Sequence, residues 1–204
     1  MLAVSVEGMS AASPTQLADE PVSKQLTDGH RREWEEYWAA DSEEHDQNGP
    51  AEALRELLED HRWLLPRGRC LVAGCGRGYD ALYLAKRGHA CVAVDFCDTA
   101  IAKAQKLLDS ADVLPGKLTL FSAIHPSQRQ QWAETYARLI VPQGTLIVLL
   151  YPLIRRGQTP PYRVTMAECE VYLKRYFVLV RVDPNCRCTE GQEGNELMSV
   201  WKRL

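Results

Sequence analysis

The residues best suited to bind a ligand form a glycine-rich turn within LVAGCGRGYDALYLAKRGHACVAVD, residues 71–95. Gly74, Gly76 and Gly78 lack a Cβ, so the backbone can turn sharply and a ligand can approach the main chain closely. Asp95 ends the second apolar stretch, where a carboxylate can accept hydrogen bonds from both hydroxyls of a ribose. The pattern therefore indicates an adenosine-containing ligand.

The turn does not by itself select the cofactor, because both NAD and S-adenosylmethionine contain that ribose. The spacing Gly76-x-Gly78-x-x-Ala81 also fits the dinucleotide fingerprint with its small third position. A tight strand-to-helix turn without a ligand is a further explanation of the glycines. An acid that caps the following turn is likewise an alternative role for Asp95.

Candidates for acid-base chemistry are few, and we assign no catalytic residue from the pattern alone. His125 and Tyr162 are the available general bases, but structural roles explain each of them as well. Tyr162 lies in TPPYRV, which is either the border of an acceptor pocket or a rigid loop that joins two elements. The cysteines include no C-x-x-C pair, so we expect free thiols and no metal site.

Composition and charge leave a small-molecule function open. The chain has 204 residues, enough for one domain, and a net charge of -3 with Lys and Arg spread among acids. This distribution gives no electrostatic argument for nucleic acid or an anionic membrane. The apolar stretches are too short to span a bilayer, and the N-terminus lacks a secretory pattern. We expect a cytoplasmic monomer with a small-molecule partner.

The order of the segments predicts an α/β fold. Residues 1–28 have little periodicity, so we expect a flexible leader before a single domain over 29–204. From residue 69 strand-like and helix-like segments alternate, as in a doubly wound, mostly parallel sheet, and the last two strands form an antiparallel pair. Strands are expected at 69–74, 90–95, 117–121, 144–153, 177–183 and 196–203, and helices at 51–65, 80–88, 97–108, 126–140 and 169–177.

Several collinear blocks resemble the thiopurine S-methyltransferase family in its broad sense, which includes thiol and halide methyltransferases. They are the Trp34-x-x-x-Trp38 pair, the glycine turn through Asp95, SAIHPSQRQQWAETYARLIVPQGTLIVLLYPL, PPYRVTMAECEVYL and the terminal MSVWKR. The resemblance implies a Rossmann-like class I methyltransferase fold and S-adenosylmethionine as cofactor. It also implies methyl transfer to a small thiol, a thiopurine or a similar soft nucleophile.

The resemblance further implies roles for individual residues. Trp34 and Trp38 enclose the methionine end of the cofactor, where a ring face attracts the sulfonium cation, although packing on an amphipathic helix also explains the pair. The remaining implied contacts are Gly74, Cys75 and Gly76 against the carboxylate and ribose, Asp95 on the ribose hydroxyls, Phe96 on the adenine face, and Tyr162 as a wall of the acceptor pocket.

The chain departs from the family between Asp95 and Ser122, where about one strand and its flanking turns are missing. We expect KLTLF, residues 117–121, to take the central position beside CLVA, because a gap there would leave core backbone groups unpaired. ACVAV, residues 90–94, would then form the sheet edge. The shortened segment leaves two further hypotheses: a catalytically impaired relative that acts as a binding or regulatory protein, and an NAD-dependent oxidoreductase.

Overall fold

A computed structural model describes residues 3–6, 24–40, 48–60, 65, 67–110, 126–154 and 161–204 of the chain. Within those ranges, no helix combines the length and the apolar composition that a bilayer-spanning helix requires.

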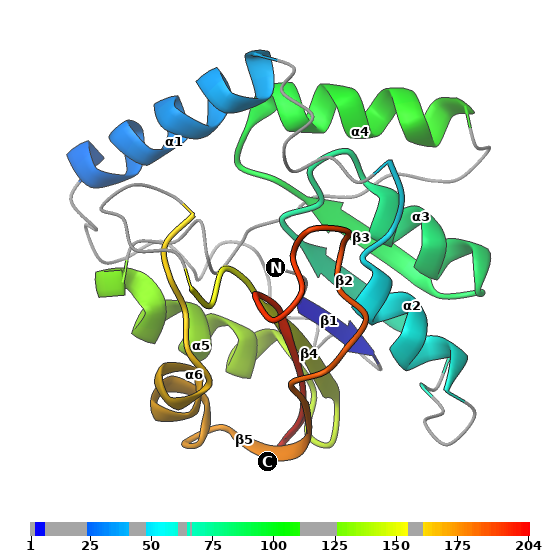
Figure 1. Cartoon of the computed structure of the whole chain (residues 1–204), viewed down its shortest axis with the longest axis vertical. Helices are drawn as coiled ribbons and strands as arrows, with labels where there is room; N and C mark the ends of the chain where they lie inside the picture. The colour runs from blue at the N-terminus through cyan, green and yellow to red at the C-terminus, as the bar shows by residue number, and fades with distance from the viewer. Residues whose placement is uncertain are drawn as a thin grey trace.

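The described residues form a mixed sheet with helices packed around it (Figure 1). Helices α2 and α3 lie on one side of the sheet in that view, α5 and α6 lie on the other, and α1 runs beside α4. The strands are β1 (Ala3–Val6), β2 (Arg69–Ala73), β3 (Ala90–Val94), β4 (Thr145–Leu150), β5 (Phe177–Asp183) and β6 (Leu197–Arg203). The helices are α1 (Lys24–Ala39), α2 (Glu52–Glu59), α3 (Tyr79–Lys86), α4 (Asp98–Ser110), the 3-10 helix η3 (Pro126–Gln128), α5 (Arg129–Leu139) and α6 (Met166–Leu173).

The six strands lie in the order β3-β2-β1-β4-β6-β5. Strands β2, β3, β4 and β5 point in one direction, and β1 and β6 run against them. The α/β fold and the antiparallel C-terminal strand are therefore confirmed. We expected mostly parallel strand pairs. Among the described strands, however, only β2 and β3 pair in parallel, and the other neighbouring strands pair antiparallel.

The N-terminal strand corrects two expectations. We expected residues 1–28 to be a leader without structure, yet Ala3–Val6 pairs antiparallel with both β2 and β4, and α1 begins at Lys24. The central place beside CLVA is held by β1. KLTLF, which we expected there, lies outside the described residues. Among the described strands, ACVAV is β3 and lies at one end of the sheet.

Burial and capping explain the elements around the sheet. All six residues of β4 are buried, as expected for an apolar run covered on both faces. Helix α6 begins with an N-cap, in which Thr165 Oγ1 accepts from the backbone amide of Glu168 and donates to the Glu168 carboxylate.

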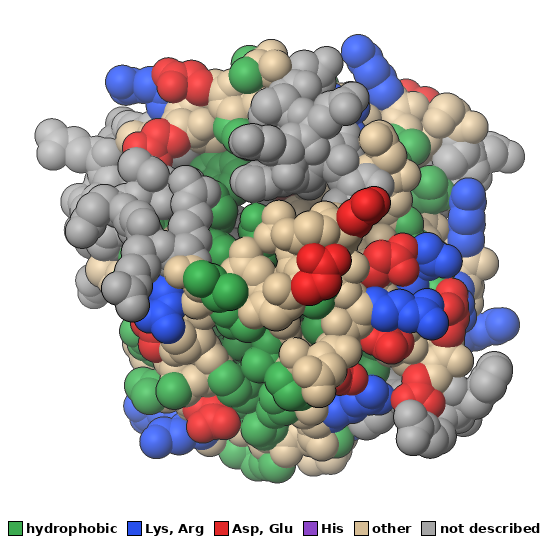
Figure 2. All heavy atoms as spheres, viewed as in Figure 1, with side chains coloured by type: hydrophobic (Ala, Val, Ile, Leu, Met, Phe, Trp, Pro, Cys, Tyr) green, Lys and Arg blue, Asp and Glu red, His purple; other side chains and the backbone are tan. Residues whose placement is uncertain are grey.

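Figure 2 shows acidic and basic side chains interspersed over the described part of one face. This mixture agrees with the small net charge of -3.

Candidate functional site

The glycine turn follows β2 at the carboxyl end of a buried strand. Gly74, Gly76 and Gly78 have φ values of 74°, 48° and 87°, a region that residues with a Cβ rarely adopt. The Gly78 amide donates to the Cys75 carbonyl at 2.7 Å, and α3 begins directly after Gly78. Burial, followed by the charge of Asp95, raises the pKa of Cys75 to about 12, so its thiol is neutral near pH 7.

Asp95 lies against this turn, as the parallel register of β2 and β3 requires. Ala73 is paired with Val94, so the two strands end side by side. The Asp95 Oδ2 atom accepts from the Gly76 amide at 3.2 Å, and Oδ1 accepts from the Cys97 amide at 3.2 Å. Burial raises the pKa of Asp95, although these amide hydrogen bonds act in the opposite direction. Phe96 follows immediately and is half-buried.

Helix α1 covers the turn through Trp38. An ideal Cβ built on Gly76 would lie 2.7 Å from Trp38 Cη2 and 2.8 Å from Cζ2, so the ring fits there because residue 76 is a glycine. The Trp38 carbonyl accepts from Lys103 Nζ at 2.8 Å, which joins the end of α1 to α4. The predicted Trp38, Gly76 and Asp95 are thus brought together.

Trp34 lies one helical turn before Trp38 on the same helix. Its ring meets Tyr37 edge to face with centroids 5.5 Å apart, and Tyr37 meets Trp38 in the same manner at 5.6 Å. The Trp34 indole nitrogen is buried and has no hydrogen-bond partner among the described residues. A buried donor without a partner is costly, which distinguishes this atom from most buried polar groups.

A second set of contacts, which the sequence pattern did not reveal, fixes α1 to the start of α4. The Glu35 carboxylate accepts from the backbone amides of Asp98 and Thr99, and Arg31 pairs with Asp98 at 2.6 Å. An acid at a helix N-terminus satisfies amides that the helix itself leaves unpaired. Because the acid comes from another helix more than sixty residues earlier, no local spacing rule could identify it.

Tyr162 is buried, with 7% of its surface exposed. Burial and then the charge of Glu33 raise the pKa of Tyr162, while Arg129 acts to lower it. The phenol is therefore neutral near pH 7, which suits a pocket wall better than a general base. His125, the other candidate base, lies outside the described residues.

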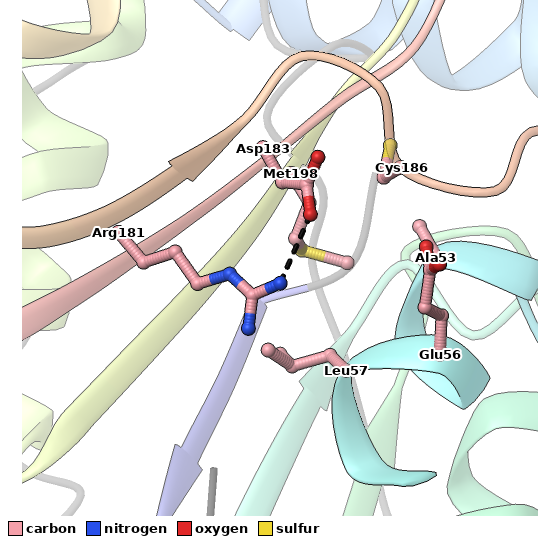
Figure 3. A pocket seen from close by; sticks show the side chains of 7 residues that line it. All are labelled: Ala53, Glu56, Leu57, Arg181, Asp183, Cys186 and Met198. Atoms are coloured by element: carbon pink, nitrogen blue, oxygen red, sulfur yellow. Dashed lines mark hydrogen bonds and ion pairs between the residues drawn. The ribbon is translucent and has the colours of Figure 1, made fainter. Parts of the chain in front are cut away.

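A separate small pocket lies between α2 and the β5–β6 pair (Figure 3). Arg181 spans it and bonds both Asp60 at 3.1 Å and Asp183 at 3.0 Å. The Glu56 carboxylate at its rim accepts from the amide of Arg187 at 2.7 Å. These charges join α2 to β5 and the segment after it, so we interpret the pocket as part of the packing. No group of three or more potential metal-ligating side chains occurs in the described ranges.

Comparisons with known proteins match the glycine turn and its surroundings to one family. The sequence profile of the thiopurine S-methyltransferase family matches residues 30–114, which include most of α1, the turn and Asp95. The probable thiol methyltransferase 2 of Arabidopsis thaliana is 27% identical over 220 residues, covering 97% of this chain and 96% of that protein. The thiocyanate methyltransferase 1 of the same plant is 30% identical over 193 residues.

Solved structures show the same fold at low identity. The N-methyltransferase NodS from Bradyrhizobium japonicum, in complex with S-adenosyl-L-homocysteine, has a TM-score of 0.60 and 12% identity, over 85% of this chain and 98% of that one. The magnesium protoporphyrin IX methyltransferase from Synechocystis has a TM-score of 0.52 and 15% identity, over 92% and 90% of the two chains. These neighbours establish a Rossmann-like class I methyltransferase fold.

The sequence relationship establishes more than the fold. Thiocyanate methyltransferase 1 is 30% identical to this chain, and the alignment covers 84% of each protein. Trp34, Trp38 and the glycine turn through Asp95, which are among the residues that suggested the resemblance, lie inside the matched profile. The chain belongs to the thiopurine S-methyltransferase family.

Proposed function

We propose that this chain transfers the methyl group of S-adenosylmethionine to a small thiol or a similar soft nucleophile such as thiocyanate. The cofactor is the one that the family uses, and the family relationship removes the NAD-dependent alternative. The observation that supports the proposal most directly is the meeting of Trp38, Gly76 and Asp95 at the carboxyl ends of β2 and β3. The names of the two plant relatives support the acceptor class.

The described residues fit the cofactor in three respects. Trp38 stands at the glycine turn, with Cη2 and Cζ2 in the space that a Cβ on residue 76 would take, so an aromatic side chain borders the place proposed for the sulfonium. A carboxylate, Asp95, stands beside the same turn, where a ribose can be held. The buried Trp34 indole donor has no partner among the described residues and can serve a polar group of the ligand.

The proposed residue roles follow the family pattern at the matching positions. Trp34 and Trp38 enclose the sulfonium and the methionine end, because an aromatic face attracts a cation. Asp95 binds the ribose hydroxyls and Phe96 packs on the adenine. The main chain of the turn, residues 74–76, lies against the carboxylate and the ribose.

The chemistry requires alignment more than acid-base catalysis. When bound, S-adenosylmethionine supplies an electrophilic methyl group whose bond to sulfur breaks as the acceptor attacks from the opposite side. The protein has to hold donor and acceptor about 3 Å apart, in line, and to exclude water. An acceptor that arrives as an anion needs no base, so the neutral Tyr162 phenol is sufficient as a wall.

The length of the chain bears on its activity. The alignment with thiol methyltransferase 2 runs over 220 positions, although this whole chain has 204 residues, so the relative carries residues that this chain lacks. We propose that the missing residues come from the strand and turns between Asp95 and Ser122. Because the family uses that region at the adenine and at the active-site rim, we expect slower turnover than in the longer relatives.

A labelled-methyl assay tests the proposal. The full chain is incubated with methyl-labelled S-adenosylmethionine and with thiocyanate, hydrosulfide or an aromatic thiol, and the labelled product is collected. We expect saturable transfer to at least one sulfur acceptor and none to a hydroxyl analogue of the aromatic thiol. Binding of S-adenosylhomocysteine without transfer to any acceptor would contradict enzymatic function and favour a binding or regulatory role.

Location and assembly are also part of the proposal. We propose a cytoplasmic monomer that acts on a small molecule and binds neither nucleic acid nor membrane. The free thiols of all seven cysteines support a reducing compartment. The interspersed surface charges support the absence of a polyanionic partner. Fractionation of cells and light scattering of the purified chain test these two points.

A further inference from the structure

Two thiols stand opposite one another on the parallel strands that lead to the cofactor site. Cys70 of β2 is paired directly with Cys91 of β3, and the two Sγ atoms are 2.9 Å apart. Paired strands lie about 4.8 Å apart, within the Cα separation of about 4.4 to 6.8 Å that disulfides span. The sulfurs need to approach by about 0.9 Å to reach bonding distance.

We propose that Cys70 and Cys91 form a reversible disulfide that ties β2 to β3. This proposal is independent of the methyl acceptor, because it concerns the strands and not the ligand. Other cysteines make different contacts: Cys75 donates to the Gly76 carbonyl, and Cys188 donates to the Cys186 carbonyl. Among the described residues, Cys70 and Cys91 are the pair whose sulfur atoms contact each other.

The two thiols differ in a way that assigns the order of reaction. Cys70 is fully buried, whereas Cys91 is half-buried on the strand that ends the described sheet. The hydrogen bond between the two sulfurs lowers the pKa of Cys91 and, followed by burial, raises the pKa of Cys70. Cys91 is therefore the thiolate that meets a reagent, and Cys70 is the resolving thiol.

The reaction balances with a low-molecular-weight disulfide, such as oxidised glutathione, as the oxidant. The Cys91 thiolate attacks one sulfur of the reagent, a mixed disulfide forms, and the first reagent thiolate leaves and takes up a proton. Cys70 then loses its proton and attacks Cys91 Sγ, which forms the Cys70–Cys91 bond and releases the second reagent thiol. Two protein thiols are oxidised and one reagent disulfide is reduced to two thiols.

The position of the pair gives the disulfide a consequence for the site. Beyond Cys70, β2 runs into the glycine turn, and beyond Cys91, β3 runs into Asp95. The disulfide would lie three residues before Ala73 and Val94, the last pair of these two strands. It would therefore fix the strand register on which the hydrogen bond from Gly76 to Asp95 depends. The oxidised and reduced chains are therefore expected to differ in the rigidity of the cofactor site.

Peptide mapping of the oxidised full chain tests the proposal. The folded chain is equilibrated with oxidised glutathione, the remaining thiols are alkylated, and the protein is digested with trypsin without reduction. Trypsin places Cys70 in peptide 70–77 together with Cys75, and Cys91 in peptide 88–103 together with Cys97. We expect these two peptides to be linked, with the loss of two of the seven alkylatable thiols and recovery of both by dithiothreitol.

Because each peptide carries two cysteines, the variants are chosen to separate them. The linked pair should persist in Cys97→Ser and be absent from Cys91→Ser, whose fold is checked by circular dichroism. Fragment-ion sequencing of the linked wild-type peptides assigns the joined sulfurs directly, even if Cys91→Ser fails to fold. A link through Cys75 or Cys97, or recovery of Cys91 only as a free thiol or a glutathione adduct, would overturn the proposal.

Discussion

The indole ring of Trp38 lies over the backbone of Gly76, so close that a Cβ on Gly76 would be 2.7 Å from Cη2. Gly76 also donates its amide to Asp95 at 3.2 Å. One glycine thus joins three elements: the end of α1, the turn after β2 and the acid after β3. The closeness of these elements explains why this position requires a residue without a side chain.

Replacing Gly76 with alanine tests this relationship. Residue 76 has φ 48°, so alanine is strained there, and its Cβ also displaces Trp38. Gly191→Ala is the matched control, because Gly191 has φ 79° and nothing lies within 4 Å of its ideal Cβ. We expect Gly76→Ala to lower the free energy of unfolding by about 1 to 3 kcal/mol more than the control does, measured by urea denaturation.

A double-mutant cycle with Trp38→Ala completes that test. If the extra cost of Gly76→Ala comes from the ring, it should disappear when the ring is absent. An equal cost in both backgrounds would show that Trp38 does not restrict this position.

The contact between α1 and α4 should depend on pH through Glu35. Burial alone would raise the pKa of Glu35, but hydrogen bonds from Thr99 and the amide of Asp98, with the charge of Arg31, outweigh it and lower the pKa below 4.5. Because the pKa of Glu35 is lower in the folded protein than in the unfolded chain, the ionised carboxylate stabilises the contact between α1 and α4 above about pH 4.5. This stabilisation is lost as the pH falls through the pKa that Glu35 has in the folded protein. Hydrogen exchange in α1, followed from pH 6 to 3, measures the loss.

Two variants separate Glu35 from general acid unfolding. Glu35→Gln should remove the acid dependence of α1, whereas Glu36→Gln, on an exposed position of the same helix, should retain it. The same titration in wild type and Glu35→Gln would argue against this role.

The central position of β1 predicts that the N-terminus is required for folding. Ser5 is paired with Leu71 of β2 and with Leu146 of β4. Proline at residue 5 removes a backbone donor from the middle of the sheet, so we expect Ser5→Pro to lower the free energy of unfolding by about 1 to 3 kcal/mol. Ser5→Ala keeps the backbone donor and serves as the control. Equal thermal unfolding of the two variants would place residues 3–6 outside the folded sheet.

Tyr162 should act as a wall and not as a base. Because its pKa is raised, the phenol keeps its proton near pH 7, and Tyr162→Phe should retain the rate and its pH profile. Tyr162→Ala removes a large apolar surface and should raise the KM for the acceptor about tenfold, the equivalent of about 1.4 kcal/mol. A wild-type rate that rises with pH through the ionisation of a tyrosine, and a Tyr162→Phe rate that is low and lacks this rise, would instead identify this residue as a base.

The sequence could reveal the glycine turn and Asp95 because both depend on local pattern. An apolar strand, glycines with positive φ and an acid at the next strand end are short-range signals, and parallel pairing then brings Gly76 and Asp95 together. The N-cap that Thr165 provides for Glu168 is local in the same sense.

Other features could not be predicted because distant residues determine them. Ala3–Val6 is only four residues long in a segment without periodicity, and its strand form depends on pairing with β2 and β4. The contact of Glu35 with the start of α4 likewise joins residues more than sixty positions apart. A pattern that is read along the chain does not contain such pairings.

Calorimetric titration with S-adenosylhomocysteine and with NAD tests the central claim most directly, in wild type and in Asp95→Ala. We expect the wild-type chain to bind S-adenosylhomocysteine and not NAD. Asp95→Ala should remain folded and bind at least about tenfold more weakly, since hydrogen bonds to a charged acceptor contribute about 1.5 to 3 kcal/mol. Unchanged affinity for S-adenosylhomocysteine in a folded Asp95→Ala variant, or binding of NAD in its place, would contradict the account.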